Sequence, residues 1–489
     1  MSDTPHIPIL RLGETYRSMN VRQIKDLGTG ETVAEMSVGN AGLLRRDASK
    51  FSQAKAALDA IPCRELMEMS AEAGRLFMEA TLPLGDHAQT PDDYVQQLSR
   101  TSGLPYRLVR ANMAKVHEAL THLDDVVRGL TRGIDPGVLD KGFGEVNGTA
   151  VSFYPTTDAL GMVMPSNSPG VNALWLPSIA FKTPVILKPG SDEPWTPWRV
   201  VQAMIAAGVP QEAFGFYPTD HEGSAAVMDL CDRSIIFGGE ATMKRYGGDP
   251  RVEVHGPGWS KVILGEDRVD DWETYIDVIV KSIAANSGRS CINASTIIVP
   301  RHGRVIAEAL AEKLAQIHPR PNDDPRAELS AIANPKVAEW ADAQITSGLK
   351  TPGAEDLTVK ARGNDARVAH FEGRTYALPT LIYCQSWDHP LCNTEFMFPF
   401  ASVVEVPQAE VLGTIGGTLV VTAITGDDGF TKALLRCPDI QRLNLGASPT
   451  SSAQWDQPHE GNLFEFLYQR RAIHHAPPGV PEPQVAGAV

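Results

Sequence analysis

Residues 160–169 read LGMVMPSNSP, an apolar β-prone run that ends in a polar, proline-rich turn. The same arrangement returns at residues 184–190 as PVILKPG. Apolar runs of this kind, with helices predicted between them, lie at residues 160–164, 184–187, 214–217, 234–237 and 261–264. Alternation of strands and helices predicts a parallel sheet covered by helices on both faces, so the expected fold class is α/β.

Polar or flexible residues follow three of these strands directly. Residues 165–167 follow the first strand, Lys188 follows the second, and Gly238 and Gly239 follow the fourth. Ligands of open α/β sheets bind beyond the carboxyl ends of the strands. We therefore expect these residues to line a ligand site.

Length and charge limit the classes of function. A chain of 489 residues is too long for one ordinary core, which predicts two or three domains. The net charge of −15 disfavours binding to nucleic acid or anionic membranes, and no apolar run is long enough to span a bilayer. The six cysteines match no zinc spacing, and the N-terminus lacks the features of a signal peptide. We expect a cytoplasmic protein with reduced thiols and no metal.

The remaining segments are read from their periodicity. Residues 1–50 show no clear period and are expected to form a partly ordered lead-in. Apolar residues spaced three and four apart between residues 103 and 133 predict one long helix that packs on a sheet. A helix at residues 271–285 lies near the start of a second predicted unit, and the proline-rich tail after Pro477 is expected to be loose.

Cys291 ends the run NSGRSC at residues 286–291, a glycine-containing turn between a predicted helix and a predicted strand. A cysteine at the end of an element is within reach of a substrate. A lone cysteine is, however, usually a buried structural residue. Position alone leaves a nucleophile and a core thiol equally open.

Five segments in this order resemble the aldehyde dehydrogenase superfamily, and together they cover about residues 150–445. They are PSNSP at residues 165–169, LKP at 187–189, FGG at 237–239, the Cys291 turn and EFMFP at 395–399. Each segment is a weak signal alone, and their common order is what makes the resemblance specific.

The resemblance implies a three-part architecture. A Rossmann-type NAD(P)-binding domain would comprise residues 1–133 and 156–256, and an α/β catalytic domain residues 257–445. Residues 134–155 and 446–489 would form a small oligomerisation arm and the C-terminal segment. Such proteins assemble as homodimers or homotetramers and act on small molecules, so the expected substrate is an aldehyde or an acyl thioester.

The resemblance also assigns catalytic roles. Cys291 would be the nucleophile, because a thiolate adds to a carbonyl and the thioester can leave again. Asn167 would donate its amide to the developing oxyanion, together with the Cys291 backbone N–H. Without the resemblance, Asn167 would be read as a turn residue near two prolines.

The cofactor would be NAD or NADP. The resemblance places its binding site at Pro165, Ser166, Lys188, Gly238, Gly239, Glu395 and Phe398. Lys188 would bind the adenosine ribose, and Glu395 the nicotinamide ribose with Phe398 beside it. On their own, these three side chains would be read as an exposed lysine, a solvated acid and a core aromatic.

The route of acyl release is left open by the run EVHGPGWSK at residues 253–261. Hydrolytic members of the superfamily carry a glutamate base in an ELGGK run. Here Gly256 and Gly258 align with the G-x-G-N run of CoA-acylating members, and Glu253 could act only if the loop folds differently. Residues 101–105, TSGLP, also look like the start of LuxC-type acyl-CoA reductases. We therefore expect exchange between an aldehyde and an acyl-CoA thioester, with coenzyme A as co-substrate, and hydrolysis to a free acid as the alternative.

Three further positions carry open readings. Ser191 stands where NAD-preferring relatives often keep a ribose-binding glutamate, although the neighbouring Asp192 and Glu193 could compensate, so NAD and NADP both stay open. Arg289 could lower the pKa of Cys291, bind a CoA phosphate or a substrate carboxylate, or form a surface salt bridge. His255 could replace the missing base, but a structural histidine in a tight turn is the favoured reading.

Overall fold

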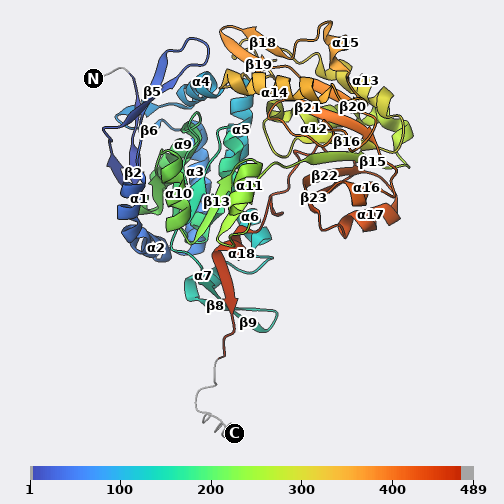
Figure 1. The fold of residues 1–489 in the computed structure, drawn as a ribbon. Helices are drawn as coiled ribbons and strands as arrows, with labels where there is room; N and C mark the ends of the chain where they lie inside the picture. The colour runs from blue at the N-terminus through green and yellow to red at the C-terminus, as the bar shows by residue number, and fades with distance from the viewer. Residues whose placement is uncertain (1–3, 475–489) are drawn as a thin grey trace.

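The computed structural model describes residues 4–474. Two lobes lie side by side, and a narrow arm extends below the first lobe (Figure 1). Each lobe is built on a sheet of seven strands, most of them parallel. The predicted α/β class is therefore confirmed, whereas the tail after Pro477 lies outside the described residues.

The sheet of the first lobe contains the strands predicted from residues 160–237. Its strand order is β14 (Val252–His255), β13 (Arg233–Phe237), β10 (Leu160–Val163), β11 (Val185–Lys188), β12 (Phe214–Phe216), β2 (Ile9–Arg11) and β3 (Glu14–Tyr16). The strands from β14 to β12 are parallel, and β2 and β3 extend the sheet in antiparallel register.

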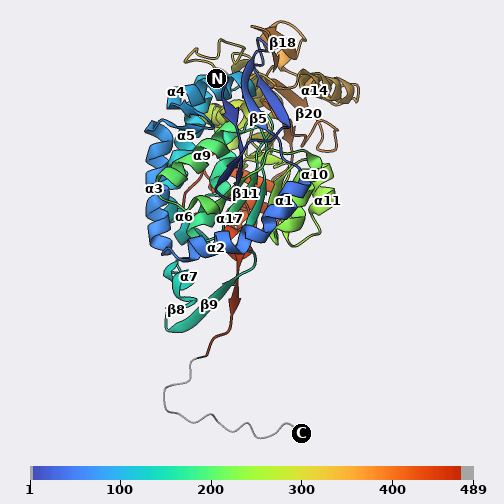
Figure 2. The ribbon, with the colours of Figure 1, turned by 90° about the vertical axis from the view of Figure 1, so that its left-hand side faces the viewer.

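Helices cover both faces of this sheet, as Figure 2 shows around β11. Val185 and Leu187 point into one apolar cluster, and Ile186 between them points into another. This alternation follows from the two-residue period of a strand. The main helices of the lobe are α1 (Ala41–Asp47), α2 (Phe51–Asp59), α3 (Cys63–Glu79), α4 (Pro91–Ser102), α5 (Tyr106–Thr121), α6 (Leu123–Leu130), α9 (Trp195–Ala206), α10 (His221–Leu230) and α11 (Glu240–Tyr246).

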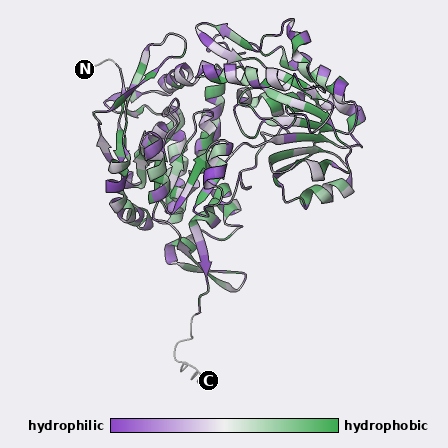
Figure 3. Ribbon diagram, viewed as in Figure 1, coloured by the Kyte–Doolittle hydropathy of each residue, from purple (hydrophilic) through white to green (hydrophobic). Residues whose placement is uncertain are grey.

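The second lobe repeats this layering. Its strand order is β17 (Ala354–Asp356), β20 (Thr380–Cys384), β21 (Phe400–Glu405), β16 (Ala294–Val299), β15 (Ser260–Leu264), β22 (Thr418–Ile424) and β23 (Ile440–Leu445). Val262 and Leu264 pack against α12 (Ile276–Ala284) and α13 (Gly303–Leu314). On the other face lie α14 (Pro335–Gly348) and α17 (Asp428–Leu435). Hydrophobic residues are concentrated in the strands of both sheets (Figure 3).

The arm is a small antiparallel sheet. Strands β8 (Phe143–Val146) and β9 (Thr149–Pro155) form a hairpin, and β24 (Tyr468–Arg471) from the far end of the chain pairs with β9. The three sheets are natural centres for the three predicted domains, whose residue boundaries stay predictions. In residues 4–474, no helix is both long and apolar enough to cross a bilayer.

The expectation of a partly ordered lead-in at residues 1–50 is wrong for residues 4–50, the part that the structure describes. Strands β1 (His6–Ile7), β5 (Thr32–Ser37) and β4 (Val21–Lys25) form a three-stranded sheet of their own. Residues of this segment are fully buried, Ile7 and Ile9 among them. Strands this short do not display a hydrophobic period, which explains the error.

The long helix predicted between residues 103 and 133 is two helices. The helical path breaks at His122, which separates α5 from α6. The predicted apolar stripe is buried, but on α5 it packs mainly against α3 and the short 3-10 helix η2 (Pro169–Leu174) rather than on a sheet. Gly103 ends α4 with a left-handed φ of 80°, a conformation that glycine adopts without strain.

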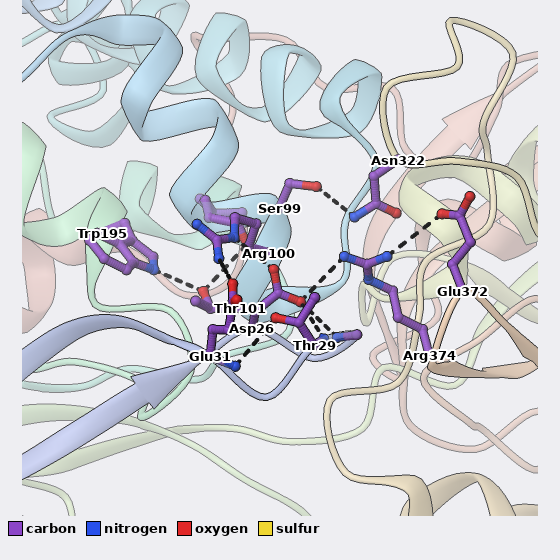
Figure 4. A network of polar contacts seen from close by, with 12 residues as sticks. Asp26, Thr29, Glu31, Ser99, Arg100, Thr101, Trp195, Asn322, Glu372 and Arg374 are labelled. Atoms are coloured by element: carbon purple, nitrogen blue, oxygen red, sulfur yellow. Dashed lines mark hydrogen bonds and ion pairs between the residues drawn. The ribbon is translucent and has the colours of Figure 1, made fainter. Parts of the chain in front are cut away.

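A buried carboxylate joins the two lobes near the N-terminal sheet (Figure 4). Asp26, in the loop after β4, accepts hydrogen bonds from Gly28 N at 2.7 Å and from Arg100 Nε of α4 at 2.6 Å. Arg374 of the second lobe lies 3.5 Å from the same carboxylate. Burial alone would raise the pKa of Asp26, but Arg100 and the backbone N–H groups lower it below its usual value.

We expect Asp26→Asn to lower the free energy of unfolding at pH 7 by about 1–3 kcal/mol, because two guanidinium groups lose a charged partner. The pKa of Asp26 is lowered in the folded state, so its stabilising effect is present above the unfolded pKa and is lost as the pH falls through the folded pKa. Urea unfolding at several pH values measures the difference. Glu31→Gln is the control, since Glu31 is 72% exposed and 3.5 Å from Arg100. Equal stability of Asp26→Asn and the wild type at pH 7 would contradict the assignment.

Candidate active site

A cavity of about 710 Å³ lies between the lobes and collects most of the predicted site residues. Its lining includes Pro165, Ser166, Asn167, Gly238, Gly239, Cys291, Glu395 and Phe398. These residues follow two strands of the first sheet, β10 and β13, or lie in two loops of the second lobe. Lys188, also predicted for the site, is not among the lining residues of this cavity, and the roles of all these residues stay predictions.

The turn that carries Cys291 has an unusual backbone. Asn286, Ser287 and Gly288 have φ values of 51°, 60° and 65°, three left-handed residues in succession. Such a conformation costs free energy for residues other than glycine, and it is retained where the surroundings impose it. A side chain at Gly288 would overlap the backbone of Phe398. The turn is therefore pressed against the segment that carries Glu395.

Arg289 anchors this turn to both lobes. Its guanidinium donates to Ser102 O and Ser330 Oγ, both at 2.7 Å, and to Ser166 O at 3.3 Å. Arg289 is 7% exposed, and burial lowers the pKa of its guanidinium to about 10. The reading as a surface salt bridge is therefore wrong, and Arg289 is a positioning residue.

Asn167 is held at the same turn. One side-chain N–H donates to Arg289 O at 2.8 Å, and the amide nitrogen also lies 3.7 Å from Met397 Sδ. A thioether sulfur is a weak acceptor. A substrate oxyanion could replace it without loss of a strong hydrogen bond, which fits the predicted role of Asn167.

The run at residues 256–261 positions both Cys291 and Glu395. Ser260 Oγ donates to Cys291 O at 2.8 Å, and a side chain at Gly258 would overlap the same carbonyl oxygen. Trp259 N donates to Glu395 Oε2 at 2.7 Å. The glycine that the sequence aligned with CoA-acylating proteins thus has a packing role against Cys291.

Cys291 is half-buried, and its thiol is a weak acid in the ligand-free protein. Burial, with the nearby charges of Glu460 and Glu395, raises the pKa of the thiol to about 12. Arg442 acts in the opposite direction. One reading of the sequence was that Arg289 lowers this pKa. Its guanidinium instead donates to Ser102 O and Ser330 Oγ, where the two lobes meet, and it is not among the groups that shift the pKa of Cys291.

Glu395 has the features expected of a ribose ligand. Burial raises the pKa of its carboxyl to about 7, and backbone N–H groups of Gly258 and Trp259 oppose the rise. Its second oxygen, Oε1, is buried without a hydrogen-bond partner among the described residues. A buried acceptor without a partner is costly unless a ligand donates to it. A ribose hydroxyl would do so, and the site therefore fits a nicotinamide dinucleotide.

At the adenosine end of the predicted cofactor site, Glu193 does not have the ribose-binding role that the sequence left open. Lys188 is half-buried at the end of β11, and burial together with the charge of Arg22 lowers its pKa. Asp192 pairs with Arg22 at 3.2 Å. Glu193 is buried and accepts from Thr196 N at 2.8 Å at the start of α9. Glu193 therefore does not replace the missing ribose-binding glutamate, as the sequence had left open.

His255 lies between two carboxylates. Its Nε2 is 2.9 Å from Glu253 Oε1, and its Nδ1 is 2.7 Å from Glu460 Oε2. Burial alone would lower its pKa, but the two carboxylates raise it to about 9. His255 is therefore an imidazolium at neutral pH and is not the base that one reading of the sequence suggested.

Four residues of the site escaped the sequence prediction. Lys115 of α5, Arg442 of β23 and the pair His459 and Glu460 all line the cavity. The last two belong to a C-terminal segment held on α6 by Asn462 Nδ2, which donates to Leu130 O at 3.0 Å. That segment has no period or motif, so no sequence signal placed it here.

Comparisons with known proteins agree with this geometry. The profile of the aldehyde dehydrogenase family matches residues 33–412. An aminoacetaldehyde dehydrogenase from Pseudomonas aeruginosa is 27% identical over 287 residues, so the match spans 55% of this chain and 55% of that protein. The chain thus matches only about half the length of this curated relative.

Solved structures share the whole fold. The aldehyde dehydrogenase KauB from Pseudomonas aeruginosa is similar with a TM-score of 0.80 at 16% identity, over 96% of each chain. An NAD-dependent aldehyde dehydrogenase from Sinorhizobium meliloti has a TM-score of 0.79 at 16% identity, over 99% of this chain and 97% of that one. The predicted aldehyde dehydrogenase-like fold is confirmed.

We expect Cys291 of the ligand-free protein to react slowly with iodoacetamide at pH 7, because its thiol is protonated. The thiolate fraction rises about tenfold per pH unit below the pKa, so the alkylation rate should rise in that proportion from pH 7 to 9. Mass spectrometry of a Cys437→Ser variant measures the rate without the other partly exposed thiol. Cys291→Ser in that background is the control, and a rate independent of pH would contradict the raised pKa.

Proposed function

The chain belongs to the aldehyde dehydrogenase family, and on this premise we propose that it oxidises a small-molecule aldehyde to a free carboxylic acid through a thioester on Cys291. NAD or NADP would be the cofactor. The observation that carries the proposal is the convergence of Cys291, Asn167 and Glu395 on one cavity between the lobes. Each of these side chains has a separate chemical task there.

The first task is addition to the carbonyl. The Cys291 thiol gives its proton to solvent water, its sulfur bonds to the aldehyde carbon, and the carbonyl electron pair moves to oxygen. Asn167 and the backbone N–H of Cys291 would stabilise the oxyanion. The anchoring of the turn by Arg289 keeps these donors in place before the substrate arrives.

The second task is to hold the cofactor. Glu395 would accept from the nicotinamide ribose through its unpartnered Oε1, and Phe398 forms the adjacent wall. Lys188 would bind the adenosine ribose. A bound nicotinamide would supply the hydride acceptor. Cys291 would then hold the acyl group as a thioester.

Acyl release is assigned to water. The sequence suggested that no base was present and favoured release to coenzyme A. Glu253 and Glu460, however, line the same cavity as Cys291, and Glu460 lies close enough to raise the pKa of the thiol. We propose that Glu460 takes a proton from the attacking water, with the His255 imidazolium holding its carboxylate. These carboxylates support a free acid as the product over an acyl-CoA thioester.

The arm supports a homo-oligomer. Its sheet extends away from both lobes (Figures 1 and 2). The strand order β24-β9-β8 puts β8 at one edge of this sheet, and an edge strand is a place where another chain can pair. We propose that this edge contacts a second subunit in a homodimer or homotetramer.

We expect Asn167→Ala to lower kcat/KM for aldehydes by about 10²–10³-fold, because one oxyanion donor is lost. Its cofactor Kd, measured by quenching of tryptophan fluorescence, should stay close to that of the wild type. Asn364→Ala, at an exposed asparagine, is the matched control and should change neither value. Full activity in Asn167→Ala would contradict its role as an oxyanion donor.

The product of oxidation in ¹⁸O-labelled water tests the release step. We expect one labelled oxygen in the free acid and full turnover without any thiol. In Glu460→Gln the first equivalent of reduced cofactor should still form, while the thioester accumulates on the protein as seen by intact mass. Glu465→Gln, at an exposed acid, is the control. Turnover that stops after one equivalent in the wild type and resumes with coenzyme A would instead support the acylating reaction.

A further inference from the structure

We propose that Lys115 and Arg442 form a subsite for a carboxylate, so that the substrate is an aldehyde carrying a carboxylate at its other end. This inference rests on the proposed function, because the subsite belongs to the same cavity as Cys291. It adds a substrate class that the motifs of the sequence do not indicate.

Lys115 lies on α5 and reaches the cavity without an anionic partner. Its side chain is accessible, and it takes part in none of the hydrogen bonds or ion pairs among residues 4–474. Burial and the charge of Arg442 lower its pKa, while Glu118 and the Cys291 thiolate oppose the change. An ammonium group in a partly desolvated wall beside a second cation gains free energy from a ligand anion.

Arg442 supplies the second positive charge, and its direct partners are neutral. It bonds to His459 Nδ1 at 2.9 Å and donates to Ser452 O at 2.7 Å. Burial and neighbouring cations, Lys115 among them, lower the pKa of His459 well below its usual value, so His459 is uncharged. Arg442 forms no ion pair among the described residues, although Glu460 is near enough to influence its pKa.

The acidic residues of the cavity are paired with groups other than Lys115 and Arg442. Glu253 and Glu460 flank the His255 imidazolium, and Asp192 pairs with Arg22. Glu395 is bonded to the backbone of the 256–261 run. Arg289 also lines the cavity, but its guanidinium is taken up by the oxygens of Ser102, Ser330 and Ser166. Lys115 and Arg442 thus remain as the two neighbouring cations that can offer a charge to a ligand carboxylate.

Apolar side chains form part of the same wall. Ala119, Val126, Leu130 and Leu174 line the cavity beyond Lys115. Such a wall suits a hydrocarbon spacer and offers little to further charged groups. An aldehyde with one carboxylate matches this combination, whereas an amino-aldehyde would meet two cations of its own sign.

Three aldehydes of similar length provide the first test: 4-oxobutanoate, pentanal and 4-aminobutanal. We expect kcat/KM to fall in that order. A charge-assisted hydrogen bond contributes about 1.5–3 kcal/mol, so Lys115→Met should lower the ratio of kcat/KM for 4-oxobutanoate to that for pentanal by about 10–100-fold. The change should lie mainly in KM, and Lys115→Arg should restore most of the ratio. Lys432→Met, an exposed lysine on α17, should leave the ratio unchanged.

A binding measurement separates this inference from the proposed function. Isothermal titration of Cys291→Ser with butanedioate and with butanoate requires no turnover. We expect butanedioate to bind more tightly, and the additional Lys115→Met change to remove the difference. Equal affinities, an unchanged ratio in Lys115→Met, or a preference for 4-aminobutanal would overturn the subsite. Loss of all aldehyde oxidation with retained selectivity for butanedioate would overturn the proposed function alone.

Discussion

The buried guanidinium of Arg289 is the contact on which the geometry of the site depends. It joins the end of α4, through Ser102, to the loop after β10, through Ser166, and to Ser330 of the second lobe. A buried charge is costly unless its donors are satisfied, so these three acceptors must remain in place together. Because Arg289 lies two residues before Cys291 and its carbonyl accepts from Asn167, one residue fixes both the nucleophile and the oxyanion donor.

This anchoring also explains how the strained turn is tolerated. The three successive left-handed residues before Arg289 raise the free energy of the folded chain. Contacts within the turn alone do not offset this increase. Neighbouring amides hold the turn: Asn293 Oδ1 accepts from Ser290 N at 2.9 Å, and Asn112 Nδ2 donates to Asn286 Oδ1 at 2.8 Å. Gly258 and Gly288 then permit close packing of backbone on either side of Cys291. The reactive thiol is therefore held by contacts from both lobes.

The parts of the fold and the site that the sequence predicted are those set by residues close together along the chain. The strands β10, β11, β13 and β15 were predictable because each is a continuous apolar run with a polar turn after it. Cys291, Asn167 and Glu395 were predictable because each lies in a short ordered motif. Lys115 and Glu460 were not, since they come from segments hundreds of residues apart and acquire their roles only through proximity. The anchor formed by Arg289 was missed for the same reason, since its acceptors are distant in sequence. The cap formed by Glu193 is local, because its partner Thr196 is three residues away, but its burial depends on the fold.

The charges of the cavity suggest why the thiol is kept protonated in the absence of ligands. Burial and the charges of Glu460 and Glu395 raise the pKa of Cys291, so a free thiolate is disfavoured. A positive charge placed beside Glu395, such as that of an oxidised nicotinamide, would lower this pKa and generate the nucleophile where it is needed. The carboxylate that completes the ribose site thus also restrains the thiol of the ligand-free protein. Activation of Cys291 would then require the cofactor to be bound first, which protects the thiol from unproductive reactions.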